Sequence, residues 1–158
     1  MYVVGVDCGG TSTKCLLAQG LGQVIGQGRG GPANYALEGC PAVVNTVAGA
    51  IDEALGQAGL TWEEMLTEGA VMVAGVAGTS IPGSIDNLTQ GFKELGFKSV
   101  SVHMDAHIAL AGALSGADGA IVISGTGSIA LGKNNKEYAR VGGWGYILGD
   151  EGSSFWIT

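Results

Sequence analysis

The sequence predicts an α/β fold built on a mixed, five-stranded sheet. Three short apolar runs near the start, separated by glycine-containing turns, predict an antiparallel meander of strands at 2–7, 14–19 and 23–29. Two further apolar runs, at 69–75 and 99–103, alternate with segments of helical periodicity, which is the pattern of parallel strands joined by crossover helices. The predicted order is β-β-β-α-β-α-β-α, with helices on both faces of the sheet.

The helical segments carry recognisable start and stop signals. Pro41 suits the first turn of a helix, and Gly59 follows the last apolar residue as a stop. Thr61 and Glu64 have the spacing of a capping box. The predicted helices cover 40–58, a short turn after Thr61, 82–95 and 106–115.

The opening pattern returns, in altered form, towards the end of the chain. A second glycine- and hydroxyl-rich turn, Ser124–Ser128, lies between apolar runs, and the predicted strands are 120–123, 129–132 and 137–141. We interpret this as a weak internal repeat. The chain is then expected to divide into a first lobe at 1–117 and the opening strands of a second, incomplete lobe at 118–158.

Composition narrows the range of functions. With 13% charged residues, about half the usual share, the surface is expected to be covered in part by a partner or a further domain. The net charge of −7 argues against nucleic acid, whose phosphates need cations. No signal peptide or membrane span is predicted. Three cysteines without CxxC spacing indicate a reducing, cytoplasmic setting.

The turn between the first two strands has the composition of a phosphate-binding loop. Gly9 and Gly10 allow backbone N–H groups to approach an anion closely, and Asp7 can hold a hydrated Mg²⁺. Donors to phosphate oxygens follow, namely Thr11, Ser12, Thr13 and Lys14. A plain hairpin turn is the alternative. However, a second turn repeats the composition with Gly125, Thr126, Gly127 and Ser128, and the pair could grip phosphates from both sides.

Two aspartates occupy positions suited to catalysis or ligand binding. Asp105 lies at the end of a predicted strand, where an open α/β sheet presents ligands, although a helix N-cap is the alternative role. Asp150 and Glu151 lie in a segment with five glycines and two aromatic residues, 142–153. They could hold a metal's water shell or a sugar hydroxyl, or simply precede a helix capped by Ser153.

Three further features have ordinary structural explanations. Asn34 suits a turn after Pro32, and Gly78 follows a buried strand, where a strand-to-helix turn is expected. His103 and His107 flank Asp105. They straddle a strand end and a helix start, so their side chains should diverge rather than form a metal site.

The motifs resemble the N-terminal half of the N-acetylglucosamine kinase family. That family lies in the sugar kinase/Hsp70/actin superfamily, beside the activator ATPases of benzoyl-CoA reductase and 2-hydroxyglutaryl-CoA dehydratase. The similarity runs in register over the whole chain. It rests on the two phosphate turns, on the Met104–Ala106 segment, and on the two glycine-rich segments Gly142–Gly145 and Gly149–Ser153.

The resemblance implies a ribonuclease H-like, actin-type lobe and a set of site residues. It implies ATP and Mg²⁺ as cofactors and Asp105 as general base. Phosphate would be bound by Gly9, Gly10, Thr11, Ser12, Thr13, Lys14, Gly125, Thr126, Gly127 and Ser128. The sugar would be bound by Asn34, Gly78, Gly143 and Asp150, and the metal by Asp7 and Asp150.

The expected function is therefore ATP-dependent phosphorylation of an amino sugar, either N-acetylglucosamine or glucosamine. An activator-type ATPase and a non-catalytic single-lobe binding module are the alternatives. No cysteine lies in a motif matching the iron–sulfur ligands of the activators, and Ile129 replaces a polar residue that touches the sugar in animal members. We expect a small-molecule sugar partner, a homodimer, and a missing C-terminal lobe or second chain, without which this chain would be inactive.

Overall fold

The computed structural model describes residues 1–20 and 22–158. The chain forms two compact units, Met1–Asp105 and Ala106–Thr158, which are considered separately below. Helix α4 (Asp105–Leu114) falls almost entirely in the second unit, whereas the sequence placed the lobe boundary after residue 117. The two units are not the predicted lobes, so the division into lobes at 1–117 and 118–158 stays a prediction.

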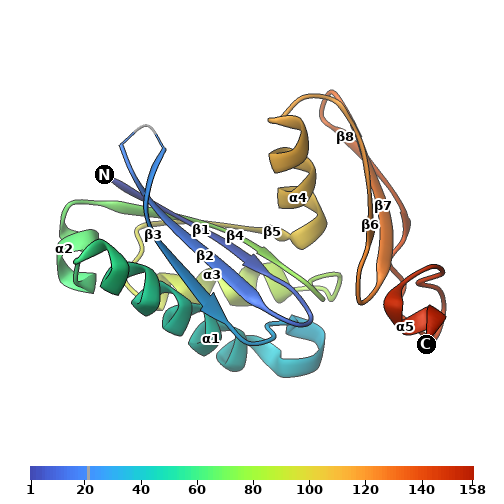
Figure 1. Cartoon of the computed structure of the whole chain (residues 1–158), viewed down its shortest axis with the longest axis horizontal. Coiled ribbons are helices and arrows are strands. Elements are labelled where there is room, and N and C mark those ends of the chain that lie inside the picture. The colour runs from blue at the N-terminus through green and yellow to red at the C-terminus, as the bar shows by residue number, and fades with distance from the viewer. Residues whose placement is uncertain (21) are drawn as a thin grey trace. The chain divides into compact units, whose positions relative to one another are not determined.

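The first unit contains the predicted five-stranded mixed sheet (Figure 1). The strand order is β3-β2-β1-β4-β5. β1 pairs antiparallel with β2, and β2 with β3, whereas the β1–β4 and β4–β5 pairs are parallel. This confirms the predicted meander followed by parallel strands. The strands are β1 (Tyr2–Cys8), β2 (Thr13–Gln19), β3 (Gln23–Gly30), β4 (Ala70–Val76) and β5 (Ser99–Met104).

Three helices belong to this unit: α1 (Tyr35–Ala58), α2 (Trp62–Thr67) and α3 (Ser84–Glu94). The predicted helix over 40–58 is present, but α1 also includes a preceding turn, Tyr35–Glu38, that was not predicted. A first turn begins after Asn34, and the backbone then breaks at Gly39, whose φ of 76° and ψ of 168° are not helical. Gly59 ends the helix in the left-handed conformation, as predicted. The predicted capping box of Thr61 and Glu64 is also present.

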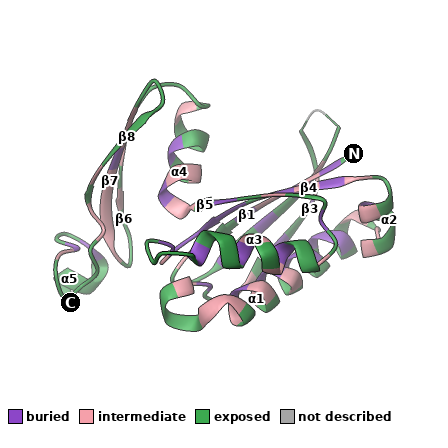
Figure 2. Ribbon diagram, turned by 180° about the vertical axis from the view of Figure 1, so that it is seen from behind, coloured by how far each residue is buried: buried purple, intermediate pink, exposed green. Residues whose placement is uncertain are grey.

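The core of the first unit lies between the sheet and α1 and α3, which both pack on one face (Figures 1 and 2). Alternate residues of β1 are buried there, as the period of two requires. Gly26 and Gly28 of β3 allow α1 to lie unusually close, because a Cβ at Gly28 would stand 1.8 Å from the carbonyl oxygen of Ala50. The sequence predicted helices on both faces, but the helix that follows β5 belongs to the second unit.

Side chains of α1 cover the outer edge of β3. Gln57 Oε1 accepts a hydrogen bond from the backbone N–H of Gln27 at 3.1 Å, and Glu53 Oε2 accepts one from that of Arg29 at 2.7 Å. The two acceptors lie one helical turn apart on α1, and the two donors are alternate residues of the strand, so the repeats of helix and strand edge match. The contacts block pairing of this edge with another strand.

The second unit is a three-stranded antiparallel sheet, β6-β7-β8, with helix α4 against one face. Its small core consists of Ala106, Leu110 and Leu131. Other apolar side chains of the sheet are exposed, Val122 to 79% and Val141 to 73%. The elements are β6 (Gly119–Ser124), β7 (Ser128–Asn134), β8 (Glu137–Gly142) and a terminal turn of helix, α5 (Ser154–Ile157). Across the described residues, no helix is both long and apolar enough to span a membrane.

Candidate functional site

The first phosphate-type turn is held by the segment that leads to α1. The N–H of Gly9 donates to the carbonyl of Ser12 at 3.0 Å and closes the turn, and the carbonyl of Gly9 accepts from Ala33 N at 3.0 Å. The buried Thr13 hydroxyl donates to the carbonyl of Gly31 at 3.0 Å. Thr13 therefore anchors the turn, and its predicted contact with phosphate stays a prediction. Gly10, Thr11 and Ser12 are exposed at the tip.

Asp7 and Lys14 lie directly opposite each other at the start of this hairpin. Both side chains are exposed, and their neighbours along each strand are buried against α1, so both lie on the face that α1 does not cover. On its other side Lys14 is paired with Arg29 of β3. Arg29 was not among the predicted site residues.

The structure brings the predicted sugar residues Asn34 and Gly78 together. Asn34 forms a parallel bridge with Ala77, and Tyr35 N donates to the carbonyl of Ala77 at 2.9 Å. Asn34 Oδ1 caps α1 by accepting from Ala36 N at 3.0 Å. Gly78 has a φ of 76°, and a Cβ there would stand 2.1 Å from Asn34 Oδ1. Gly78 is thus required for the position of Asn34, whose amide nitrogen can still donate to a ligand.

Asp105 begins α4 directly after β5, as predicted, and lies near the carboxyl end of β1. The register shows this: Cys8, the last residue of β1, is paired with Val76 of β4, and Val76 with Met104, which directly precedes Asp105. Burial raises the pKa of Cys8 to about 12, a hydrogen bond with Thr13 partly opposes this, and the carboxylates of Asp7 and Asp105 raise the pKa further. Within the first unit, the turn and the predicted residues therefore gather at the carboxyl ends of parallel strands, where open α/β sheets bind ligands.

The second turn is clamped to the segment that precedes α5. Ser124 Oγ donates to the carbonyl of Gly152 at 2.8 Å, and Ser128 Oγ donates to that of Glu151 at 2.9 Å. Both Ser154 N and Ser154 Oγ donate to the carbonyl of Gly125 at 2.8 Å. As with Thr13, the hydroxyl of Ser128 serves as an anchor, and its phosphate contact stays a prediction. Thr126 is exposed at the tip of the turn.

Asp150 places its carboxylate against this second turn. Its backbone is left-handed, with a φ of 64°, and the residue is only 8% exposed. A Cβ at Gly127 would stand 2.8 Å from Asp150 Oδ2, so a side chain there would displace the carboxylate. In the described part of the chain no hydrogen bond or ion pair engages this carboxylate. Among the described residues no fully buried side-chain oxygen lacks a partner, so the Asp150 oxygens reach solvent, where they could accept from the water ligands of a cation or from a sugar hydroxyl.

Gly143 and its aromatic neighbours complete the second unit's candidate surface. Gly143 N donates to the carbonyl of Ser128 at 2.8 Å, and a Cβ there would stand 3.0 Å from Ile129 Cδ1. Ile129 therefore packs beneath Gly143. The guanidinium of Arg140 lies 4.6 Å from the ring centroid of Trp144, a cation–π distance.

The two histidines that flank Asp105 have separate contacts. His103 Nε2 is 2.7 Å from Ser101 Oγ, and the ring of His107 lies 4.7 Å from that of Tyr138. Among residues 1–20 and 22–158, no three His, Cys, Asp or Glu side chains converge as a ligand set for a metal. A site for Mg²⁺ would accordingly need water and phosphate ligands beside a carboxylate, which is the usual coordination of this ion in proteins.

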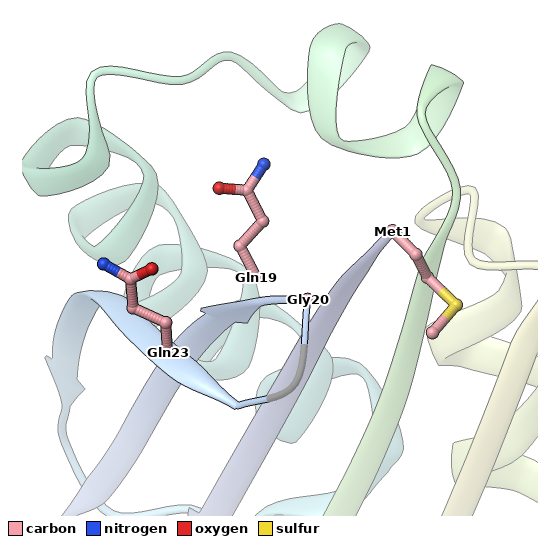
Figure 3. Close-up of a pocket in the computed structure, with 4 residues that line it drawn as sticks. All are labelled: Met1, Gln19, Gly20 and Gln23. Atoms are coloured by element: carbon pink, nitrogen blue, oxygen red, sulfur yellow. The ribbon is translucent and has the colours of Figure 1, made fainter.

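A pocket of about 610 Å³ lies away from these residues, at the amino end of β1 (Figure 3). It is lined by Met1, Gln19, Gly20 and Gln23, whose side chains carry no titratable group. It is open, and nothing in its lining corresponds to the predicted site.

The comparison with known proteins decides the family. The model of the BadF/BadG/BcrA/BcrD ATPase family matches residues 4–158. The chain belongs to this family.

Sugar kinases are among the relatives of this BadF/BadG/BcrA/BcrD family member. The chain is 36% identical over 156 residues to an N-acetylmuramic acid/N-acetylglucosamine kinase from Clostridium acetobutylicum, covering 98% of this chain and 50% of the relative. It is 33% identical over 153 residues to a glucosamine kinase from Vibrio cholerae, covering 96% and 50%. The chain thus spans about half the length of the curated relatives it matches.

A crystal structure described as a candidate N-acetylglucosamine kinase from Chromobacterium violaceum has the same fold. Its TM-score is 0.76 at 30% identity, over 96% of this chain and 52% of that one. The predicted actin-type α/β fold and the predicted resemblance to an N-terminal half are both confirmed. Sequence reasoning did not find Arg29 or the serine clamp around Gly125. The alternation of β3 could have shown that Arg29 shares a face with Lys14, but only once the register was known.

Proposed function

We propose that this chain supplies the phosphate turns and the general base of an ATP-dependent amino-sugar kinase. The observation that carries the proposal is the gathering of the Gly9–Ser12 turn, Asn34, Gly78 and Asp105 at one end of the first unit's sheet. The sugar-kinase relatives support it, and N-acetylglucosamine and glucosamine are the proposed substrates. Since the chain spans half of these relatives, the kinase would act as a two-lobed protein, completed by a C-terminal lobe or a second chain.

In this proposal Asp105 accepts the proton of a sugar hydroxyl as that oxygen attacks the γ-phosphorus of ATP. One O–P bond forms and the bond to the leaving ADP oxygen breaks. General-base help of this kind is worth roughly 10²–10⁴-fold, and the rest comes from positioning and charge stabilisation. Phosphate oxygens would be bound by exposed donors and by backbone N–H groups of the two turns, Gly9–Lys14 and Gly125–Ser128. The N–H groups of Gly9 and Gly125 already donate to the carbonyls of Ser12 and Gly127, so the other N–H groups are the available donors.

The sugar would be oriented by the amide of Asn34, the backbone at Gly78 and Gly143, and the carboxylate of Asp150. Asp7 and Asp150 fit a role as acceptors for the water ligands of Mg²⁺, because one carboxylate is exposed beside Lys14 and the other is largely buried without a protein donor among the described residues. When bound with ATP, Mg²⁺ would neutralise charge developing on the phosphate oxygens.

The reaction is placed in the cytoplasm, where ATP is available and the free thiols of Cys8, Cys15 and Cys40 stay reduced. The exposed Val122 and Val141 of the second sheet are proposed to be covered in the complete protein, by the further lobe or by a second copy in a homodimer.

The decisive experiment measures ADP release from Mg-ATP with N-acetylglucosamine, with glucosamine and with no sugar. Sugar-dependent ADP and a phosphorylated sugar are expected from the two-lobed protein, and little or no turnover from the 158-residue chain alone. The Asp105→Asn variant is expected to lower kcat at least ~100-fold with a smaller effect on the sugar KM. ADP release that ignores the sugar would favour an activator-type ATPase, and a near-normal kcat for Asp105→Asn would remove Asp105 from the mechanism.

A further inference from the structure

Two cations lie side by side next to the first turn, on the open face of the sheet. Lys14 of β2 and Arg29 of β3 are directly opposite each other in the antiparallel ladder. Their strand neighbours face α1: Thr13 and Cys15 are buried, and a Cβ at Gly28 would collide with the helix backbone. Lys14 and Arg29 therefore project from the opposite face, and both are exposed.

Lys14 is flanked by the carboxylate of Asp7 on one side and by a second cation, Arg29, on the other. Directly opposed residues have Cβ atoms about 4.5–5.5 Å apart, and like charges in that arrangement are destabilising. In the described part of the chain, neither Lys14 nor Arg29 forms an ion pair with a carboxylate. The chain has only 7 Lys and Arg against 14 Asp and Glu, so the meeting of two cations is not a consequence of a basic surface.

The backbone beneath Arg29 is held in place. Its N–H donates to Glu53 Oε2 at 2.7 Å, so the Glu53 carboxylate binds the backbone at the strand edge. Gly28, next to it, is packed against the backbone of α1 at Ala50. A guanidinium on such a fixed strand loses little backbone freedom when it binds a ligand.

We propose that Arg29, together with Lys14, binds the terminal phosphate groups of the nucleotide held by the Gly9–Ser12 turn. Lys14 lies two residues beyond that turn and acts as a point charge, and Arg29 adds a planar fork that can bind two phosphate oxygens at once. The inference rests on the proposed function and deepens it, since it adds a phosphate-binding residue from β3.

The test is titration of inorganic tripolyphosphate into the 158-residue chain by calorimetry at low ionic strength. The variants are Arg29→Gln, Lys14→Gln, Arg29→Lys and, as control, Lys98→Gln. Lys98 is exposed and directly precedes β5, at the end of the sheet opposite the turn, so its loss changes the net charge equally. Circular dichroism checks that each variant is folded.

Arg29→Gln is expected to weaken tripolyphosphate binding roughly tenfold or more, as for loss of a charge-assisted hydrogen bond. Lys14→Gln should have a similar effect, Arg29→Lys should recover only part of the affinity, and Lys98→Gln should stay close to wild type. Equal binding by Arg29→Gln and Lys98→Gln would overturn the proposal, as would the absence of binding by the wild-type chain at millimolar tripolyphosphate. Because the probe contains neither sugar nor adenosine, the result does not depend on kinase activity.

Discussion

Replacement of Gly78 by alanine should disrupt the start of α1 through Asn34. Gly78 has a φ of 76°, so any Cβ brings left-handed backbone strain of roughly 1–2 kcal/mol. The new Cβ would also stand 2.1 Å from Asn34 Oδ1 and 2.7 Å from Ala36 N. The Asn34 side chain would have to leave its capping position.

The extra cost can be separated from the backbone strain. Loss of an N-cap costs about 0.5–2 kcal/mol, and forcing an atom into a filled site costs about 1–3 kcal/mol. Gly83 is the matched control, because its φ is 78° and a Cβ there meets nothing within 4 Å. Gly78→Ala should therefore be less stable than Gly83→Ala by about 2–4 kcal/mol, a large part of the total stability of a small domain.

Guanidinium chloride unfolding followed by circular dichroism measures both variants. The same measurement in the Asn34→Ala background tests whether the destabilisation acts through Asn34. The loss of unfolding free energy caused by Gly78→Ala should be smaller there, because Oδ1 is gone, but it should not disappear, because Ala36 N remains. Equal unfolding midpoints for Gly78→Ala and Gly83→Ala would refute the reasoning.

Three other predictions use the same chain. Gly28→Ala should lower the free energy of unfolding by about 3 kcal/mol, because α1 must move away from the new Cβ. Gly49→Ala, on α1 with nothing within 4 Å of a new Cβ, should raise it by up to about 1 kcal/mol. Equal unfolding midpoints for the two variants would contradict this. Hydrogen bonds from Thr61 lower the pKa of Glu64 from 4.5, so the stability that Glu64 contributes is complete above that pH and is lost as the pH falls through the lowered pKa. The stability difference between wild type and Glu64→Gln should accordingly shrink between about pH 6 and pH 3, and a constant difference would speak against the capping box. Burial raises the pKa of Cys8 and of Cys15 to about 12, so iodoacetamide should label the folded chain first at Cys40. The unfolded chain should be labelled at all three thiols, and mass spectrometry measures both patterns. Rapid labelling of Cys8 in the folded chain would contradict its burial.

Local patterns were sufficient for most of the fold. The alternation of β1 and the apolar spacing of α1 report on the same buried face, so strand and helix positions follow from the sequence. The helix after Gly39 begins where Pro41 predicts it, but the turn before Gly39 was missed because it depends on the cap at Asn34. That cap has room only because Gly78, which is distant in the sequence, carries no side chain, and no local pattern reports this.

The candidate site depended more on register and on distant contacts. The pairing of Lys14 with Arg29 follows only when the β2–β3 register is known, and a bulge at Leu17/Ala18 makes that register hard to derive. The carboxylate of Asp150 lies against Gly127 because the backbone of Asp150 is left-handed, which is uncommon outside glycine. The sequence shows that residue 150 is a carboxylate, but it does not show that this residue is buried.

The two turns also show why counting hydroxyl groups in a loop overestimates how many of them can bind phosphate. Thr13 in the first turn and Ser128 in the second donate to carbonyls of a later segment, at Gly31 and Glu151 respectively. Each hydroxyl satisfies a backbone acceptor that would otherwise be unpaired at the base of a tight turn. The donors left for phosphate are then backbone N–H groups, exposed side chains at the tips such as Thr11, and nearby cations. In a chain with a net charge of −7, those cations limit how strongly a polyphosphate can bind, which is why a second cation beside Lys14 matters more than another hydroxyl.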